Sequence, residues 1–345
     1  MNTFNLAGLV RIALTGEGPA HRYLSEELAY FASQSREAPD LEIAVGPFEM
    51  PRGDRVLLSN RAYTVGSDWC AFTSAYRCVR WKTMLRNVEG RPLRVELAGG
   101  RLAGRVFLLK ILIPLIRHLL HRSNATLVKA SAVAEAERAT ILAGWSGSGK
   151  TSAALALVEE GFDYLSDTFS ILAADGAVHP MPLLVHLFGR NVTASVRSRL
   201  AGRRKCESAI KNVLFRATRG AVNLSVTLPF KELFPERKVA PSAKIERFVL
   251  LSPHSENPPA IKPLKDKGTA LKRVLCTEKF ESADFELARL AYLHVNPDGA
   301  FAGYWEDAAR IQRAALEKAR LAELSYSGPL DAGALALLRR REDGQ

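Results

Sequence analysis

The clearest pattern of apolar and polar positions lies in the middle of the chain. Short apolar runs that are typical of strands stand on both sides of a longer apolar segment with helical character. The predicted strands cover Thr126–Ala134, Ala139–Leu142, Phe162–Leu165 and Phe169–Ala173, and the predicted helix covers Ser152–Glu160. Gly161 ends the helix, and Asp175-Gly176 is a dipeptide typical of a hairpin turn. The order strand, glycine loop, helix, strand predicts a βαβ-like unit.

The flanking segments have weaker patterns. Strand-like pieces bordered by Gly or Pro predict an N-terminal domain of α/β or mostly β type, and they cover Leu41–Val45, Arg55–Leu58 and Leu93–Leu97. Strands are also predicted at Ala221–Leu228 and Arg247–Leu251, and helices at Trp305–Leu324 and Asp331–Arg341. The apolar run Val106–Leu120 predicts a buried helix with a break near Pro114. The patterns predict an α/β protein with domains over residues 1–104 and 105–345.

Composition narrows the class of protein. The chain has 345 residues, of which 47% are hydrophobic and 24% are charged, and this mix excludes a wholly disordered chain. Four cysteines in a chain of this length exclude a disulfide-built scaffold and favour a reducing, cytoplasmic setting. No apolar run is long enough for a membrane span, and the N-terminus has no basic region before its apolar stretch. We therefore expect neither a membrane span nor a signal peptide.

A glycine-rich motif follows the strand predicted at Ala139–Leu142. Its residues read GWSGSGKT and fit the pattern G-x-x-x-x-G-K-[ST]. Glycines let the backbone curl so that its N–H groups point into one concavity, and the following helix adds the positive end of its dipole. Such a loop binds nucleotide phosphates, and its hydroxyl residue ligates Mg²⁺. With ATP and Mg²⁺ as expected cofactors, the candidate binding residues are Gly144, Ser146, Gly147, Ser148, Gly149, Lys150, Thr151 and Ser152.

The motif alone leaves the reaction open, because ATPases, GTPases and several kinases share it. The chain lacks the Asn-Lys-x-Asp sequence of a GTPase and the Ser-Gly-Gly-Gln signature of an ABC-type ATPase. The bland alternative is an ordinary glycine turn, and the strand before the motif and the helix after it disfavour that interpretation. The motif therefore predicts a nucleotide-binding protein of the P-loop class.

An acidic partner is expected at the end of a neighbouring strand. Asp167, in the sequence YLSDT, lies there, 17 positions after Lys150. Such a carboxylate can hold Mg²⁺ or accept a proton from an attacking hydroxyl. The alternative role for Asp167 is to cap the next turn. Thr151 and Asp167 are the candidate metal ligands.

The pattern of strand, GxSGxGK[ST], apolar helix, glycine and aspartate resembles the HPr kinase/phosphorylase family. The nucleotide core of that family is itself similar to that of phosphoenolpyruvate carboxykinase, and we expect the same core here. The resemblance runs over about residues 126–187. It implies that Lys150 binds phosphate, that Thr151 binds magnesium, and that Asp167 is the base for the hydroxyl nucleophile.

Two positions depart from the family pattern. Thr168 stands in place of the second of two adjacent acids, and Lys129 stands in place of a histidine. A lysine at this position can place a positive charge near Asp167 or the γ-phosphate, which makes Lys129 a candidate catalytic residue. Its alternative role is that of a solvated strand lysine.

These departures disfavour the combined kinase and phosphorolysis activity of the regulatory HPr enzymes. The chain is more similar to divergent relatives that phosphorylate a serine hydroxyl of lasso-peptide precursors. The resemblance implies an ATP-dependent kinase whose acceptor is a hydroxyl of a peptide or protein, and also a homo-oligomer, since the HPr enzymes form hexamers. The alternatives are a small-molecule hydroxyl kinase, a nucleotide-binding module without transfer activity, and a P-loop NTPase that couples hydrolysis to nucleic-acid binding.

Positive charge is concentrated after the predicted site. The chain has a net charge of +12, and residues 190–219 hold nine Lys and Arg residues against Glu207 alone. This excess predicts a docking surface for an acidic peptide or protein, with four candidates: Arg190, Arg197, Arg203 and Arg204. Nucleic acid is disfavoured because aromatic residues are few and no nucleic-acid motif is present. The alternative is a solvated helix face.

Overall fold

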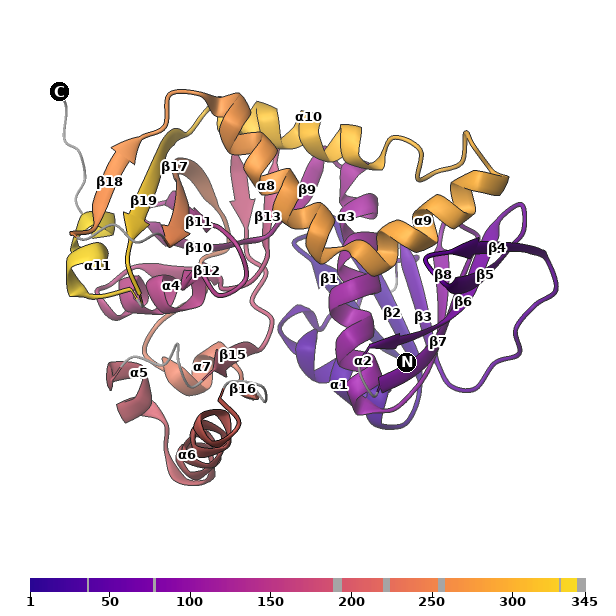
Figure 1. Ribbon diagram of the computed structural model, residues 1–345, viewed down its shortest axis with the longest axis horizontal. Coiled ribbons are helices and arrows are strands. Elements are labelled where there is room, and N and C mark those ends of the chain that lie inside the picture. Colours follow the sequence, from indigo (N-terminus) through magenta and orange to yellow (C-terminus); the bar gives the residue numbers. More distant parts are fainter. Residues whose placement is uncertain are drawn as a thin grey trace. The chain divides into compact units, whose positions relative to one another are not determined.

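The computed structural model describes residues 1–35, 37–76, 79–188, 194–219, 224–253, 258–328 and 330–339. Its contacts divide the chain into two compact units. Unit 1 consists of Met1–Leu127 and Glu278–Ile311, and unit 2 consists of Val128–Thr277 and Gln312–Gln345. The boundary expected after residue 104 lies inside unit 1, which also takes in a later segment of the chain. Each unit combines a large sheet with helices, so the protein is α/β (Figure 1).

Unit 1 is built on an eight-stranded sheet in the order β1-β2-β3-β8-β7-β6-β5-β4. The strands are β1 (Asn2–Leu6), β2 (Val10–Gly16), β3 (Leu41–Val45), β4 (Asp54–Leu58), β5 (Arg61–Val65), β6 (Trp69–Tyr76), β7 (Val79–Arg86) and β8 (Leu93–Ala98). β3 pairs in parallel with both β2 and β8. Three of these strands, β3, β4 and β8, were predicted from the sequence as strand-like pieces bordered by Gly or Pro.

Helices cover the sheet of unit 1. They are α1 (Pro19–Glu27), the single 3₁₀ turn η1 (Ala29–Phe31), α2 (Arg101–Phe107), the π-helical turn η2 (Leu108–Leu112), α3 (Ile113–His121) and α9 (Ala283–Val295). The predicted break near Pro114 is wrong, because the backbone keeps a right-handed helical conformation from Phe107 through Ile113. The π turn directly before Pro114 explains this continuity. Proline lacks an N–H and its ring crowds the preceding turn, and a wider turn accommodates both features.

The nine-stranded second sheet has the order β12-β10-β11-β17-β14-β13-β9, and β19 joins β17 to β18. Its strands are β9 (Ala125–Val128), β10 (Ala130–Glu135), β11 (Arg138–Ala143), β12 (Asp163–Ser166), β13 (Ser170–Ala173), β14 (Ala177–His179), β17 (Ala243–Pro253), β18 (Ala260–Pro263) and β19 (Arg320–Tyr326). A separate pair consists of β15 (Val185–Phe188) and β16 (Ser225–Leu228). The predicted strand Ala221–Leu228 corresponds to β16, and its first three residues lie outside the described residues.

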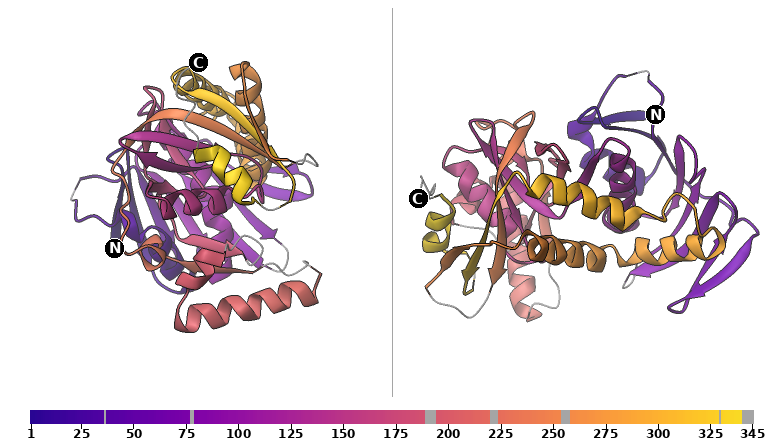
Figure 2. Two further views of the ribbon diagram at one scale, coloured as in Figure 1. Left: turned by 90° about the vertical axis from the view of Figure 1, so that its left-hand side faces the viewer. Right: turned by 90° about the horizontal axis from the view of Figure 1, so that it is seen from above.

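Apolar clusters lie on both faces of this sheet. The remaining helices are α4 (Lys150–Glu159), α5 (Ala194–Arg199), α6 (Gly202–Ala217), α7 (Phe230–Leu233), α8 (Lys267–Glu281), α10 (Tyr304–Leu316) and α11 (Ala332–Arg339). Residues 278–281 of α8 and 304–311 of α10 belong to unit 1, and the other residues of these helices belong to unit 2. One cluster joins the sheet to α4, α7 and α11, and the other joins it to α8 and α10 (Figure 2). The predicted βαβ-like unit is confirmed as β11, α4 and β12. Among the described helices, none has the length and apolar character that a bilayer span requires.

Two elements differ from the sequence prediction. Residues 126–134 form two strands rather than one, with a bend at Lys129, because β9 neighbours β13 whereas β10 lies between β11 and β12. The predicted helix Trp305–Leu324 ends at Leu316 as α10, and the following residues form β19. β19 pairs in parallel with β17, and this pairing overrides an apolar spacing that is compatible with both conformations.

Two buried histidines on α3 are held neutral by their surroundings in unit 1. His118 packs edge to face on Phe301, with ring centroids 4.8 Å apart, and the ring of His121 lies 3.3 Å from the hydroxyl of Thr126. Burial, together with the positive charge of Arg122, lowers the pKa of His118 to about 4. Burial and the charge of Arg117 lower the pKa of His121 to about 3. Both rings therefore remain unprotonated in the folded protein at neutral pH.

We expect the free energy of unfolding to fall as the pH decreases from 7 to 5. Histidines in the unfolded chain take up protons near pH 6.5, whereas His118 and His121 in the folded protein do not, so acid favours the unfolded state. The expected loss is about 1–2 kcal/mol per histidine, measured by urea unfolding. Replacing the exposed His294 with Gln should leave this slope unchanged, and replacing His118 with Gln should reduce it. A flat profile would contradict the burial of the two neutral rings.

Candidate functional site

The candidate site lies at one edge of the nine-stranded sheet. β11 and β12 are both antiparallel to β10, so they run parallel to each other and their carboxyl ends meet at the same edge. The register pairs Ala130 with Ala143, and Ala132 with Ser166. The glycine-rich loop that follows β11 and the carboxylate of Asp167 that follows β12 are therefore brought together.

Three further segments reach this edge. β10 runs in the opposite direction, so Lys129, which precedes it, lies where its neighbours end. β17 and β19 are parallel to β11 and end there as well, with Pro253 paired to Tyr326. The edge thus combines five stretches of chain that are far apart in the sequence.

The loop between β11 and α4 has the backbone conformation that its glycines permit. Gly144, Gly147 and Gly149 have φ angles of 156°, 89° and 76°. A side chain at Gly144 would also collide, because its Cβ would lie 2.7 Å from the Ser148 hydroxyl and 2.8 Å from the Leu251 carbonyl oxygen. The spacing of glycines in the motif is thus required by backbone angles and by close approach to β17.

The first turn of α4 faces this loop. Gly149 occupies the N-cap position in a left-handed conformation and provides no side-chain cap for the helix amides. Ser146 and Gly147 are exposed at the tip of the loop, and Ser152 is half-buried on the first turn. The hydroxyl of Ser148 is buried and makes no hydrogen bond within the described residues. The loop and helix start therefore present polar hydrogen-bonding groups suited to an anion.

Lys150 folds back over the loop. Its side chain is only 7% exposed, and the ammonium group donates hydrogen bonds to the carbonyl oxygens of Gly144 at 2.7 Å and Trp145 at 2.8 Å. These carbonyls stabilise a charge that would otherwise be costly to bury. The ammonium group can exchange them for the stronger acceptor oxygens of a phosphate without leaving the loop.

Asp167 is almost fully buried, with 1% of its surface exposed. Its carboxylate accepts a hydrogen bond of 3.2 Å from the hydroxyl of Tyr164. Its main-chain carbonyl accepts hydrogen bonds from the hydroxyls of Ser131 and Thr151, the latter at 3.3 Å. The two expected metal ligands, Thr151 and Asp167, are therefore direct neighbours. Half-buried Thr168 follows them in the chain.

Tyr164 was not identified from the sequence. Burial, with the nearby charge of Asp167, raises the pKa of its hydroxyl well above the ordinary value, so this group remains protonated and acts as a donor. In the sequence, the one feature that could have indicated its role is its position three residues before Asp167 in a predicted strand. That feature does not distinguish it from a tyrosine of the core. The described residues contain no cluster of three or more His, Cys, Asp or Glu side chains that could hold a metal ion.

A small cavity opens beside the start of the loop. It has a volume of about 160 Å³ and its lining includes Lys129, Gly144, Trp145 and Arg273. The ammonium group of Lys129 lies 4.3 Å from the centre of the Phe169 ring, which is a favourable contact between a cation and an aromatic face. Arg273 donates hydrogen bonds to the Ser252 hydroxyl at 2.7 Å and to Glu323 at 2.8 Å. Sequence reasoning missed Arg273 because no motif connects α8 to the loop.

The C-terminal segment holds the other side of the loop. Tyr326 donates a hydrogen bond to the carbonyl oxygen of Ser148, and burial raises the pKa of its hydroxyl to about 12, so it remains a donor. In a trans peptide the carbonyl and the next N–H point in opposite directions. This contact therefore directs the N–H of Gly149 away from Tyr326. Leu330 covers the same residue, since a Cβ at Gly149 would lie 2.7 Å from its Cδ1 atom.

The candidate docking residues of the basic segment, residues 190–219, differ in their exposure and in their ion pairs. Arg190 lies outside the described residues. Arg197 and Arg203 are exposed, whereas Arg204 forms ion pairs with Glu207 at 3.6 Å and Glu232 at 3.7 Å. Part of the positive charge counted in the sequence is therefore neutralised by glutamates, including one from outside the segment.

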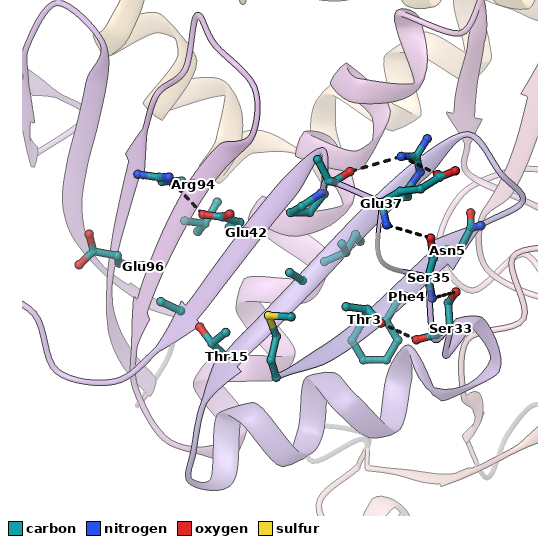
Figure 3. A pocket seen from close by; sticks show the side chains of 18 residues that line it. Thr3, Phe4, Asn5, Thr15, Ser33, Ser35, Glu37, Glu42, Arg94 and Glu96 are labelled. Carbon is teal, nitrogen blue, oxygen red and sulfur yellow. Dashed lines mark hydrogen bonds and ion pairs between the residues drawn. The ribbon is translucent and has the colours of Figure 1, made fainter.

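A second hollow lies in unit 1, on the sheet face formed by β1, β2, β3 and β8 (Figure 3). It has a volume of about 570 Å³. Two arginines that line it are each paired with a glutamate of the same lining, Arg11 with Glu37 at 2.8 Å and Arg94 with Glu42 at 2.9 Å. Because these charges neutralise each other, the hollow is a weaker candidate for a binding site than the edge of the nine-stranded sheet that carries the glycine loop. We call that edge the loop edge.

No protein-family model matches this chain, and no curated protein matches it. The geometry of the glycine loop, Lys150 and Asp167 is therefore the basis for a functional assignment.

Replacing Tyr326 with Phe should lower the stability of the glycine loop while preserving the packing of the apolar core. The variant loses one buried hydrogen bond to Ser148, which is worth about 1 kcal/mol of unfolding free energy. If the loop binds ATP, as the sequence motif predicts, the affinity for ATP should also fall several-fold. Urea unfolding and equilibrium titration with ATP measure the two effects. The matched control is Tyr30→Phe, which removes a half-exposed hydroxyl from unit 1. Unchanged stability and ATP affinity in Tyr326→Phe would contradict a positioning role for this contact.

Proposed function

We propose that the protein is an ATP-dependent kinase that transfers the γ-phosphoryl group to a hydroxyl, with serine of a peptide or protein as the expected acceptor. The observation that carries the proposal is the arrangement at the loop edge. A glycine loop with three positive φ angles lies beside the buried residue Asp167, and the hydroxyl of Thr151 donates a 3.3 Å hydrogen bond to the main-chain carbonyl of Asp167. In this proposal unit 2 has a nucleotide core of the HPr kinase and phosphoenolpyruvate carboxykinase type.

The loop binds the phosphates of ATP. Its N–H groups and the first turn of α4 surround the β- and γ-phosphates, and the buried hydroxyl of Ser148 adds a donor. Lys150 leaves the carbonyls of Gly144 and Trp145 and binds the β/γ-oxygens. The hydroxyl of Tyr326 orients the peptide bond between Ser148 and Gly149 through its hydrogen bond to the Ser148 carbonyl oxygen.

Thr151 and Asp167 would hold Mg²⁺. The fit rests on their proximity, since the Thr151 hydroxyl bonds to the main-chain carbonyl of Asp167, and on the hard oxygen donors that both side chains provide. A bound Mg²⁺ neutralises charge on the β- and γ-phosphates. Because Asp167 is the only carboxylate of this pair, the remaining ligands in this scheme are phosphate oxygens and water.

Asp167 orients the acceptor and receives its proton. A bond forms between the acceptor hydroxyl oxygen and the γ-phosphorus, the bond from that phosphorus to the bridging oxygen of ADP breaks, and the hydroxyl proton passes to the carboxylate. The hydrogen bond from Tyr164 fixes one oxygen of this carboxylate and thereby its plane. Lys129 supplies positive charge from the cavity beside Gly144, where it stabilises the transferred group.

A second candidate is a nucleotide-binding module without transfer activity. Two observations favour it: Thr168 stands at the position where a second acid would complete the metal ligands, and Lys129 packs on Phe169. ATP binding without label transfer would identify this case.

Replacing Lys150 with Ala should remove phosphoryl transfer, by at least about a hundredfold, and weaken ATP binding, because the positive charge at the β/γ-oxygens is lost. The measurement is label transfer from γ-labelled ATP to a library of serine-containing peptides, together with ATP titration. The control variant is Lys265→Ala, at an exposed lysine of unit 2. Parental transfer in Lys150→Ala would refute the role of the loop.

Replacing Asp167 with Asn should separate binding from chemistry. The amide preserves the size of the side chain but is a far weaker base, so transfer should fall about 10²- to 10⁴-fold while ATP affinity changes little. Single-turnover label transfer and ATP titration report the two quantities on the same protein. Asp298→Asn, at an exposed position, serves as the control. If transfer by the Asp167 variant matched that of the parent, the carboxylate would not be the base.

A further inference from the structure

Helix α6 has its apolar face turned toward solvent. Its exposed apolar residues follow the helical spacing of i, i+3, i+4, i+7, i+8 and i+11 and form one continuous stripe. We call this the α6 stripe, and its members are Cys206, Ala209, Ile210, Val213, Leu214 and Ala217. The side chains of Ile210 and Val213 are 68% and 67% exposed. The helix lies at the periphery of unit 2 (Figure 1, Figure 2).

The polar face of α6 is the one that packs on the protein. Ser208 is its buried residue, and Glu207 and Lys211 lie beside it and form an ion pair with each other. Lys211 also donates a hydrogen bond of 2.7 Å to the carbonyl oxygen of Ser225 in β16. Arg204 adds an ion pair of 3.7 Å to Glu232 of α7.

These contacts fix the rotation of the helix about its axis. Turning the apolar stripe inward would break the hydrogen bond of Lys211 to Ser225 and the ion pair of Arg204 with Glu232. The exposed stripe is therefore a property of the anchored helix rather than of a helix without contacts. Contiguous exposed apolar surface of this kind marks an interaction site.

The charges around the stripe define its partner. Arg203 lies at its start, and Lys205 and Arg216 lie along one border, all exposed. The single acidic residue of α6, Glu207, borders the stripe near Ile210, and ion pairs with Lys211 and Arg204 neutralise its charge. The surface offered to a partner is thus apolar and positively charged. A second copy of the same stripe would bring like charges together, so self-pairing is disfavoured.

We propose that the α6 stripe docks an acidic amphipathic helical segment of a protein or peptide partner. This inference rests on the proposed function in one respect, because the partner is then the phosphate acceptor, held at a segment apart from its reacting hydroxyl. The apolar side chains of the segment cover Ile210, Val213 and Leu214, and its carboxylates pair with the bordering cations. A membrane surface fits less well, because the stripe contains no aromatic residue and few bulky ones.

The experiment measures docking on the full chain without nucleotide. The probe is a fluorescent synthetic peptide of the length of α6, 16 residues, with leucines at helical spacing and glutamates elsewhere. The comparison peptides are a scrambled peptide of the same composition and one with lysine in place of glutamate. We expect the acidic amphipathic peptide to bind at least about tenfold more tightly than either, with an affinity that falls as salt screens the charges.

Substitutions in the protein locate the binding. Ile210→Ser combined with Val213→Ser should weaken the affinity about tenfold or more, since two apolar contacts are lost. Arg216→Gln should reduce the salt dependence. The matched control is Leu57→Ser, at a position in unit 1 that is 66% exposed, and it should leave the affinity unchanged. Circular dichroism and thermal unfolding verify that each variant is folded.

The outcomes separate docking from catalysis. Lys150→Ala should bind the peptide with parental affinity, because docking needs no nucleotide. If the parental protein docks the peptide but transfers no label to the serine-containing peptides, only the proposed function is overturned. Equal binding of the scrambled peptide, or an unchanged affinity in the double variant, overturns the docking proposal. It is also overturned if the α6 stripe instead binds phosphatidylserine vesicles, or if the double substitution abolishes self-association of the chain.

Discussion

The pairing of β10 between β11 and β12 is the constraint on which the candidate site depends. Its ladder of main-chain hydrogen bonds fixes which residues lie at the edge, and a slip of one residue would turn every side chain to the opposite face. Because β10 is antiparallel to both neighbours, its beginning and their ends coincide. Lys129, the glycine loop and Asp167 are neighbours for this reason, and the remaining geometry of the loop needs only the backbone angles that glycine allows.

The edge concentrates charge in buried surroundings, and hydrogen bonds stabilise it there. Lys150 is held by two carbonyl oxygens and Asp167 by Tyr164. Main-chain carbonyl groups and a protonated tyrosine thus provide the hydrogen bonds that water provides to exposed charges. Such groups are costly for stability alone, so their accumulation beside a glycine loop at the start of a helix supports a chemical role for the edge.

Helix α6 shows the same conflict between stability and another requirement. A helix of a globular protein normally buries its apolar face, and here ion pairs and one hydrogen bond to β16 hold the polar face inward instead. Local features that disagree with the general rules of folding are expected where function imposes them. Buried charges at the loop edge and an exposed apolar face on α6 both reduce stability. The proposed kinase activity explains the first feature, and the proposed docking surface explains the second.

The local elements of unit 2 were predictable from short stretches of sequence. The order β11, loop, α4 and β12 followed from apolar spacing and from glycines whose conformations are properties of a few adjacent residues. The same argument placed Lys150, Thr151 and Asp167 near one another, because strand ends in a βαβ-like unit share an edge. It did not place the boundary of unit 1, because residues 278–311 return to that unit after a long excursion.

Contacts between residues far apart in the sequence depend on strand pairing. Tyr326 reaches Ser148 because β19 pairs with β17, and the same pairing turned a segment with an ambiguous apolar pattern into a strand rather than the end of α10. The direction in which α6 faces was likewise hidden, since periodicity shows that a helix has two unlike faces but not which one is anchored. Strand order and long-range ion pairs carry this information, and neither has a signature in a short window of sequence.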